Sequence, residues 1–230
     1  MSTDAHPSSV VVLVHGLYMH GFWMGLLGRR LERRGHRVVT FSYPSLKESP
    51  EANADSLQRW LETLDSERVD FVAHSLGGLV LRHLLHRHSE QRPGRVVTLG
   101  TPHQASAAAR VIESRGLGVA LGRSRAGGLL GGFPAWNPEA EIGSIAGSVG
   151  LGLGRLIPGL PVPNDGTVAV AETQFRGMTD HLVLPVTHSG LIFSGRVANS
   201  CDMFLCAGRF GADVPPIDVA ARVARPRPNP

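Results

Sequence analysis

The chain has 230 residues, of which 42% are hydrophobic and 18% charged, and its formal net charge of +4 rests almost entirely on arginine. This size and balance are typical of one soluble globular domain that buries a large core. They argue against nucleic-acid binding, because the basic residues are scattered and only 6% of the chain is aromatic. They also exclude an integral membrane segment, because no stretch approaches the roughly 18 apolar residues that one needs.

Apolar runs rich in β-branched residues alternate with helical patterns in the first hundred residues. Strands are expected at residues 10–14, 36–43, 69–73 and 95–99, and helices at residues 21–34, 53–66 and 76–88. The buried stripe of the first helix is expected to be Phe22, Leu26, Leu27 and Leu31, with Gly35 ending the helix. The alternation predicts an α/β fold with a mostly parallel, doubly wound sheet.

The regular alternation stops near residue 100. Residues 104–138 are rich in glycine, alanine and arginine and are interpreted as a lid-like insertion with a helix at residues 105–115. Strands are then expected at residues 141–146 and 182–186, a Gly/Pro-rich crossing at residues 147–163 and a long helix at residues 188–205. Residues 222–230 should form a disordered tail. We therefore expect a single domain, residues 1–230, with its core over residues 10–209.

The cysteine pattern and the N-terminal residues bear on location. Cys201 and Cys206 fall five residues apart in one expected helix and point in different directions, so we expect reduced thiols that are buried or half-buried. Residues 1–9 lack the basic and apolar regions of a secretory signal. These observations predict a cytoplasmic protein.

Residues 72–78, Val-Ala-His-Ser-Leu-Gly-Gly, place Ser75 between an expected strand and an expected helix. A serine with small residues two positions before and after it, at such a turn, is the pattern of a nucleophile elbow. The same local pattern occurs around Ser148, but the residues that follow are Gly-Leu-Gly-Leu-Gly, which form helices poorly. The context favours Ser75 as a nucleophile over Ser148, and over its reading as a helix N-cap.

A serine nucleophile needs a base and an acid that orients the base. His188 directly follows the expected strand at residues 182–186, where such a base belongs, whereas His181 precedes that strand. Asp165 lies in an Asn-Asp-Gly turn between Ser75 and His188, in the chain order Ser, Asp, His. Asp180 and Asp202 are the other candidate acids.

Five other histidines are expected to have other roles. His83, His86 and His88 lie on the helix after Ser75 and are expected at its surface, and the His74 side chain is expected to point away from the serine. His15 is expected to fix the loop after the first strand by side-chain hydrogen bonds. That loop places Leu17 where its N–H, together with that of Leu76, would form an oxyanion hole.

Taken together, these pieces resemble the α/β-hydrolase superfamily, specifically its bacterial lipase- and esterase-like members. The matching segments are residues 15–17 (His-Gly-Leu), 73–78, 100–103 (Gly-Thr-Pro-His), 164–168 (Asn-Asp-Gly-Thr-Val) and His188. The resemblance implies an α/β-hydrolase fold with Ser75, Asp165 and His188 as triad. It also implies a trimmed N-terminus, because the first expected strand already leads into the His-Gly turn.

The function that we predict is a serine hydrolase that cleaves carboxylic esters of small-molecule or lipid acyl substrates, with no metal or cofactor. Four apolar side chains of the insertion are candidates for lining the acyl pocket, or for ordinary core packing: Leu129, Leu130, Phe133 and Trp136. An acyltransferase or thioesterase on the same triad, and a non-catalytic lipid-binding protein, are the alternatives. Peripheral membrane contact and oligomeric state are left open.

Overall fold

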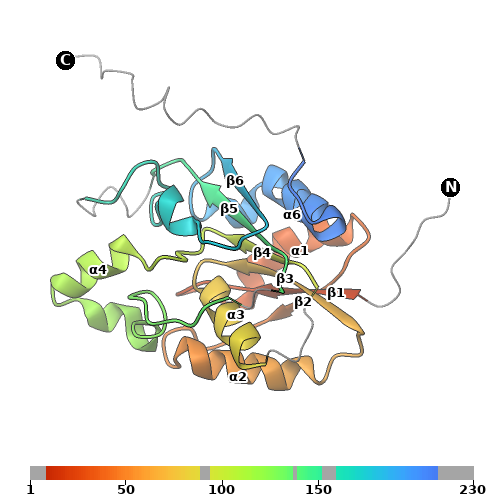
Figure 1. Ribbon diagram of the computed structural model, residues 1–230, viewed down its shortest axis with the longest axis horizontal. Helices are drawn as coiled ribbons and strands as arrows, with labels where there is room; N and C mark the ends of the chain where they lie inside the picture. The colour runs from red at the N-terminus through yellow and green to blue at the C-terminus, as the bar shows by residue number, and fades with distance from the viewer. Residues whose placement is uncertain (1–8, 89–93, 137–138, 152–158, 212–230) are drawn as a thin grey trace, which may run out of the picture.

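Six strands form one sheet in the order β2-β1-β3-β4-β5-β6, and every neighbouring pair is parallel (Figure 1). The computed structural model describes residues 9–88, 94–136, 139–151 and 159–211. The strands are β1 (Ser9–Val14), β2 (Arg37–Phe41), β3 (Arg68–His74), β4 (Val96–Leu99), β5 (Ile142–Gly147) and β6 (Asp180–Leu184). The predicted parallel sheet is confirmed, and the expected tail at residues 222–230 lies outside the described residues.

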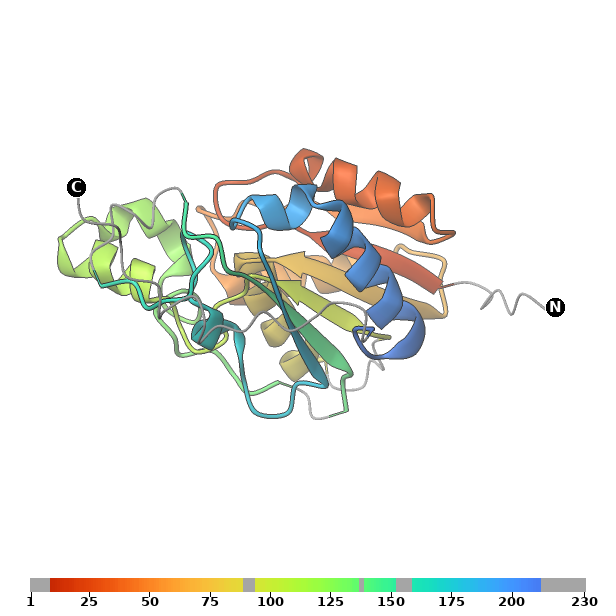
Figure 2. The same cartoon turned by 90° about the horizontal axis from the view of Figure 1, so that it is seen from above.

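Helices cover both faces of this sheet. The α-helices are α1 (Gly25–Glu32), α2 (Pro50–Leu61), α3 (Leu76–Arg87), α4 (Ala107–Ser114), α5 (Gly190–Phe193) and α6 (Gly195–Ala207). Short 3-10 helices are η1 (Gly21–Met24), η2 (Gly118–Ser124) and η4 (Val170–Thr173). In Figure 1, α1 and α6 lie on one side of the sheet and α2 and α3 on the other. Figure 2 shows the segment that carries α4 and η2 (green) at the end of the molecule opposite the start of β1.

The core is split into two layers by the sheet, and β1 shows why the sequence requires this. Val10, Val12 and Val14 belong to the apolar cluster under α2 and α3, whereas Val11 and Leu13 belong to the cluster under α1 and α6. Successive side chains of a strand point to opposite faces. A continuous apolar run that is rich in β-branched residues therefore fits a strand that is buried on both faces.

The first helix departs from its expected pattern. Residues 21–34 form η1 followed by α1, and the change of helix type turns Met24 inward in place of Phe22. Phe22 is 80% exposed and Leu26 is 38% exposed, whereas Leu27 and Leu31 are buried as expected. The turn that follows α1 ends at Gly35, whose φ of +92° lies in the region that glycine favours.

Three further expectations need correction. The last helix is not continuous, because Ser194 has extended backbone and caps α6 through the N–H of Val197. The last strand begins at Asp180 and ends at Leu184, before residues 185–186. His83 is buried, because the insertion packs over α3 and Gly127 O lies 2.6 Å from His83 Nε2.

Candidate active site

Ser75 occupies a strained turn between β3 and α3. Its φ of 51° and ψ of −119° lie outside the regions that non-glycine residues favour. Such backbone strain persists only where the surroundings hold it, and it is typical of functional sites. Here the Ser75 N–H donates to Leu99 O at 2.8 Å, and Thr101 Oγ1 donates to Ser75 O at 2.9 Å. These bonds anchor the turn to the end of β4.

The turn leaves no room for larger residues on either side. A Cβ atom at Gly77 would lie 2.6 Å from both Val14 O and His15 O, and Ala73 is fully buried. A Cβ atom at Gly16 would lie 3.1 Å from Ser75 Cβ. The glycines therefore allow the loop after β1 to contact the serine turn directly.

The same close approach brings the two expected oxyanion donors to the serine turn. Leu76 is the first residue of α3, so its N–H has no acceptor within the helix. Leu17 follows Gly16, which contacts Ser75. Within the described residues, neither the Leu17 N–H nor the Leu76 N–H donates a hydrogen bond.

The buried Asp165 and the half-buried His188 form a hydrogen-bonded pair. His188 Nδ1 lies 2.7 Å from Asp165 Oδ2, and the His188 N–H donates to Asp165 O at 2.8 Å. Asp165 is fully buried, and its Oδ1 accepts from the N–H groups of Thr167 and Val168 at 2.9 and 2.7 Å. With the proton on Nδ1 facing the carboxylate, His188 keeps Nε2 as its acceptor nitrogen.

A third strand end makes space for this pair. Gly100 follows β4 with a φ of +59°, and a Cβ atom there would lie 3.0 Å from His188 Nδ1 and 3.1 Å from Asp165 Oδ2. A Cβ atom at Gly147, at the end of β5, would lie 2.7 Å from Asp165 Cβ. Ser75, Asp165 and His188 thus lie where the neighbouring strands β3, β4 and β5 end. Among the residues that the structure describes, no hydrogen bond joins Ser75 Oγ to His188.

His74 contacts both the backbone and the ring of His188. The sequence analysis did not predict this contact. His74 Nε2 lies 3.1 Å from His188 O, and the two ring centroids are 4.7 Å apart. Burial, followed by the proximity of His188, lowers the pKa of His74 to about 3. His74 is therefore neutral near neutral pH and donates through Nε2 to the backbone of His188. Adjacency to Ser75 was the only sequence signal for this role.

His15 fixes the loop after β1, as the sequence predicted. Its Nε2 accepts from the Tyr43 N–H at 3.2 Å, and its ring stacks on Tyr43 with centroids 4.3 Å apart. Its Nδ1 lies 2.9 Å from Gly16 O, and Tyr43 Oη donates to His15 O at 2.7 Å. Burial lowers the pKa of His15, which favours the neutral ring that this bonding pattern requires. Tyr43 was not singled out from the sequence.

The rival acids and the rival base are engaged elsewhere. Asp180 accepts from the N–H groups of His181 and Phe210, and Asp202 pairs with His36 at 2.8 Å. His181 Nε2 lies 2.9 Å from Thr173 Oγ1, near the beginning of β6. None of these contacts involves His188.

The expected pocket residues lie in and around the insertion. Leu129 and Trp136 are buried in the core cluster under α3, and Leu130 and Phe133 are partly buried against it. Trp136 Nε1 donates to His103 Nδ1 at 3.4 Å, and its ring stacks on Phe175. These positions fit core packing, and their role in binding an acyl group stays a prediction.

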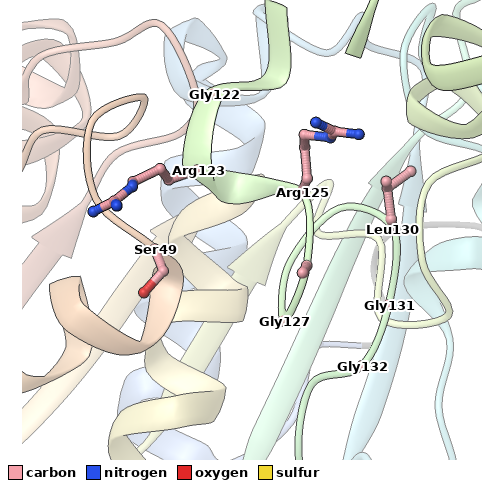
Figure 3. A pocket seen from close by; sticks show the side chains of 9 residues that line it. Ser49, Gly122, Arg123, Arg125, Gly127, Leu130, Gly131 and Gly132 are labelled. Carbon is pink, nitrogen blue, oxygen red and sulfur yellow. The ribbon is translucent and has the colours of Figure 1, made fainter. Parts of the chain in front are cut away.

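Two open cavities border the insertion. The first, of about 970 Å³, lies between Ser49 and the glycines of residues 127–132 (Figure 3). It is also lined by Leu130 and by two arginines, Arg123 and Arg125. The second, of about 670 Å³, is lined by Phe133. Neither of these two cavities includes Ser75 or His188. Arg125 pairs with Glu113, and Arg123 lies 3.7 Å from Glu48.

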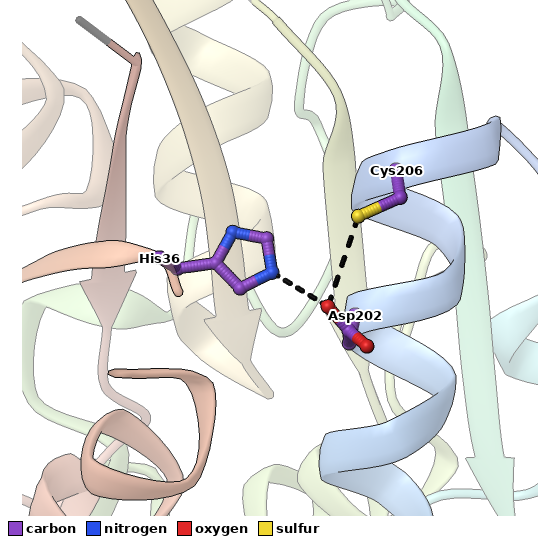
Figure 4. Close-up of side chains that lie close together, drawn as sticks. All are labelled: His36, Asp202 and Cys206. Atoms are coloured by element: carbon purple, nitrogen blue, oxygen red, sulfur yellow. Dashed lines mark hydrogen bonds and ion pairs between the residues drawn. The ribbon is translucent and has the colours of Figure 1, made fainter. Parts of the chain in front are cut away.

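Three side chains elsewhere have the chemistry of metal ligands. His36, Asp202 and Cys206 have ligand atoms within 4.8 Å of one another (Figure 4). His36 Nε2 and Cys206 Sγ both contact Asp202 Oδ1, and Arg34 Nε lies 3.8 Å from Asp202 Oδ2. These contacts describe an ion-pair network between the turn before β2 and α6. Cys201 and Cys206 are free thiols as predicted, and Cys201 is buried, but Cys206 is exposed, contrary to the expectation of a buried or half-buried thiol.

The fold and the strained serine turn define an α/β-hydrolase fold, and comparison with solved structures agrees. The mature lipase BlEst2 of Bacillus licheniformis has a TM-score of 0.65 and 18% identity, covering 87% of this chain and 92% of its own. The metagenomic carboxyl esterase MGS0156 has a TM-score of 0.65 and 15% identity, covering 89% and 76%. The pyrethroid hydrolase PytH has a TM-score of 0.58 and 16% identity, covering 86% and 98%.

The chain belongs to the family described as Domain of unknown function (DUF7379), whose sequence pattern matches residues 2–117, about half of the chain. A comparison with curated proteins finds no match. Of the helices that the structure describes, none combines the length and the hydropathy needed to cross a bilayer.

Proposed function

We propose that the protein is a carboxylic ester hydrolase that works through a covalent acyl-enzyme on Ser75. The observation that carries the proposal is the part-buried hydrogen bond between His188 Nδ1 and Asp165 Oδ2, at the same sheet edge as the strained Ser75 turn. The names of the structural neighbours, a lipase, a carboxyl esterase and a pyrethroid hydrolase, support the same class of reaction.

In the proposed first step, Ser75 Oγ attacks the ester carbonyl carbon while His188 Nε2 takes the hydroxyl proton. Asp165 holds the imidazole orientation and stabilises the imidazolium that forms. The negative charge on the carbonyl oxygen is stabilised by the N–H groups of Leu17 and Leu76. His188 then gives its proton to the departing alkoxide, and the acyl group remains on Ser75.

In the second half of the reaction, His188 Nε2 takes a proton from water. The resulting hydroxide attacks the acyl carbon, and the Ser75 oxygen leaves and regains the proton from His188. The acid is released and the enzyme returns to its starting state. His74 contributes as a positioning residue, because its bond to His188 O holds the backbone of the base.

The acyl group is proposed to lie against the apolar side chains of the insertion, Leu129, Leu130, Phe133 and Trp136. Truncation of the partly buried Phe133 to alanine should change the preference for acyl length without loss of the short-chain activity. An unchanged chain-length profile would place the acyl site elsewhere.

Hydrolysis of p-nitrophenyl esters by the His188→Ala variant tests the proposed chemistry. Loss of the base should lower kcat by about 10³-fold or more. The matched control is His181→Ala, which removes the rival histidine at the other end of β6 and should leave turnover near that of the wild type. Equal activity of the wild type and His188→Ala would contradict the proposal.

A further inference from the structure

Four apolar side chains protrude together from η1, the start of α1 and the end of α5. The group, called the apolar rim below, consists of Phe22, Trp23, Leu26 and Phe193, with exposed fractions of 80%, 51%, 38% and 41%. The rings lie in edge contact, with centroids 6.3 Å apart for Phe22 and Trp23 and 6.5 Å for Trp23 and Phe193. All four line one groove of about 410 Å³.

The fold does not require these side chains at the surface. Met24, Leu27 and Leu31 already cover the sheet from the same helical segment. Isolated exposed apolar residues are ordinary, but a contiguous group marks an interaction site. The apolar rim therefore needs a partner that offers an apolar environment.

Unpaired positive charge lies beside the rim. Arg29 lines the groove, and Arg30 donates to Phe193 O. Arg33, one turn further along, is also exposed. In the part of the chain that the structure describes, no carboxylate lies within ion-pair distance of these three arginines. The partner of the rim should consequently carry negative charge.

Both segments of the rim are close in sequence to the candidate active site. η1 begins four residues after Leu17, and α5 begins two residues after His188. In Figure 2, the first helical segment (red-orange) and the segment before α6 (blue) lie side by side on the same face of the molecule. A surface bound to the rim would lie near the expected oxyanion loop and the proposed base.

We propose that the apolar rim docks the protein on an anionic lipid bilayer. Phe22 and Trp23 enter the headgroup region, where exposed aromatic side chains are favoured, and the three arginines contact lipid phosphates. A second copy of the chain fits less well, because a symmetric dimer through this patch would bring the unpaired arginines of both copies together. Docking on the bilayer does not depend on the proposed hydrolase function. The further step, that the protein takes its ester substrates from the bilayer, rests on that function.

Sedimentation of the full chain with vesicles tests docking. Vesicles of phosphatidylcholine mixed equally with phosphatidylglycerol should bind the protein, and phosphatidylcholine alone should bind it poorly. The Phe22→Ala/Trp23→Ala variant should bind about tenfold more weakly. Arg29→Gln and Arg33→Gln should each cost about fivefold, and salt near 1 M should weaken binding by the wild type.

The matched control is Leu117→Ala/Val119→Ala, which removes two apolar side chains that are 57% and 85% exposed but lie in the insertion. This variant should bind like the wild type. Fluorescence gives a second readout, because Trp23 is the exposed tryptophan among the described residues. Its emission should shift to the blue on anionic vesicles, and Trp23→Phe should lose the shift while retaining most of the binding.

Three results would overturn the proposal. These are no binding to anionic vesicles, equal binding to both vesicle types without salt dependence, or an equal loss in the rim variant and the control. Self-association that the rim variant abolishes, without vesicle binding, would assign the surface to a second copy instead. Turnover of a water-soluble ester should be unchanged in the rim variant, so that a failure of docking is distinguishable from a failure of the hydrolase proposal.

Discussion

The segments around Ser75 and Ser148 share one local pattern, Ala-x-Ser-x-Gly, and each follows a buried parallel strand, β3 or β5. Only Ser75 enters a helix, and only Ser75 has positive φ, 51°. The Ser148 hydroxyl donates to the carbonyl oxygen of Leu184, the last residue of β6, at 3.3 Å. Two serines with the same residue types two positions before and after them therefore have different backbones and different partners.

The difference between the two serines comes from their surroundings, which the local pattern Ala-x-Ser-x-Gly does not specify. Around Ser75, the missing Cβ of Gly77 lets the loop after β1 approach, and α3 presents its free N–H groups. At the second site, the missing Cβ of Gly147 makes room for Asp165. The β5 segment thus positions the proposed acid, whereas the β3 segment positions the proposed nucleophile.

The largest expected effect comes from removing each serine in turn. Ser75→Ala should lower kcat for a p-nitrophenyl ester by about 10⁶-fold, because the nucleophile is lost. Ser148→Ala should retain wild-type turnover, since only one weak hydrogen bond to Leu184 O is removed. Steady-state kinetics of both variants measures this contrast, and a severe loss in Ser148→Ala alone would reverse the assignment.

Asp165→Asn should lower kcat by about 10⁴-fold, because an amide favours the wrong tautomer of His188. The control is Asp202→Asn, which alters a carboxylate of α6 that pairs with His36 and should leave kcat unchanged. Retention of activity in Asp165→Asn would show that the bond to His188 is only structural.

The two glycines that follow the serines sharpen the comparison through stability. Gly77→Ala should lower the free energy of unfolding by about 2–3 kcal/mol, because its Cβ would lie 2.6 Å from two backbone carbonyls. Gly150→Ala should cost less than about 1 kcal/mol, because the nearest atom, at 2.8 Å, is the movable Asn164 Oδ1. Urea unfolding compares the two variants, and similar losses would argue against a specially crowded turn at Ser75.

The residues that precede the two serines are His74 and Gly147, and only His74 can titrate. We therefore expect His74 to contribute to the pH dependence of the free energy of unfolding. The pKa of His74 falls from 6.5 to about 3 on folding, so between these values only the unfolded chain binds the proton. The stability that depends on neutral His74 is therefore present above pH 6.5 and lost as the pH falls toward 3. One such group gives a slope of about 1.4 kcal/mol per pH unit.

His74→Gln should remove that slope from the unfolding free energy, because glutamine keeps a donor toward His188 O but does not titrate. The control is His86→Gln, at an exposed position of α3. Urea unfolding at a series of pH values measures the slopes, and parallel curves for the wild type and His74→Gln would refute a buried neutral His74.

Much of this arrangement could be read from the sequence because it rests on local patterns. Residues 10–14 are apolar throughout and mostly β-branched, which indicates burial on both faces. Ser75 and His188 each follow a strand pattern, and Asp165 lies in a turn between them, in the expected chain order. Since parallel strands end at one edge, their proximity could be expected without coordinates. Their catalytic roles stay predictions.

Features that depend on distant partners could not be read in this way. The bond between His74 and His188 joins residues 114 positions apart, and the burial of His83 depends on the insertion. Helical periodicity predicts that Phe22 is buried, because periodicity alone cannot show that η1 precedes α1 and turns Met24 inward. The insertion has too little periodicity to indicate which of its apolar residues face a substrate.

Covalent labelling with a fluorophosphonate tests the central claim most directly. The account predicts that the wild type is labelled at one residue, that peptide mass analysis identifies this residue as Ser75, and that Ser75→Ala is not labelled while Ser148→Ala is. Absence of labelling in the folded wild type, or a label on Ser148, would contradict it.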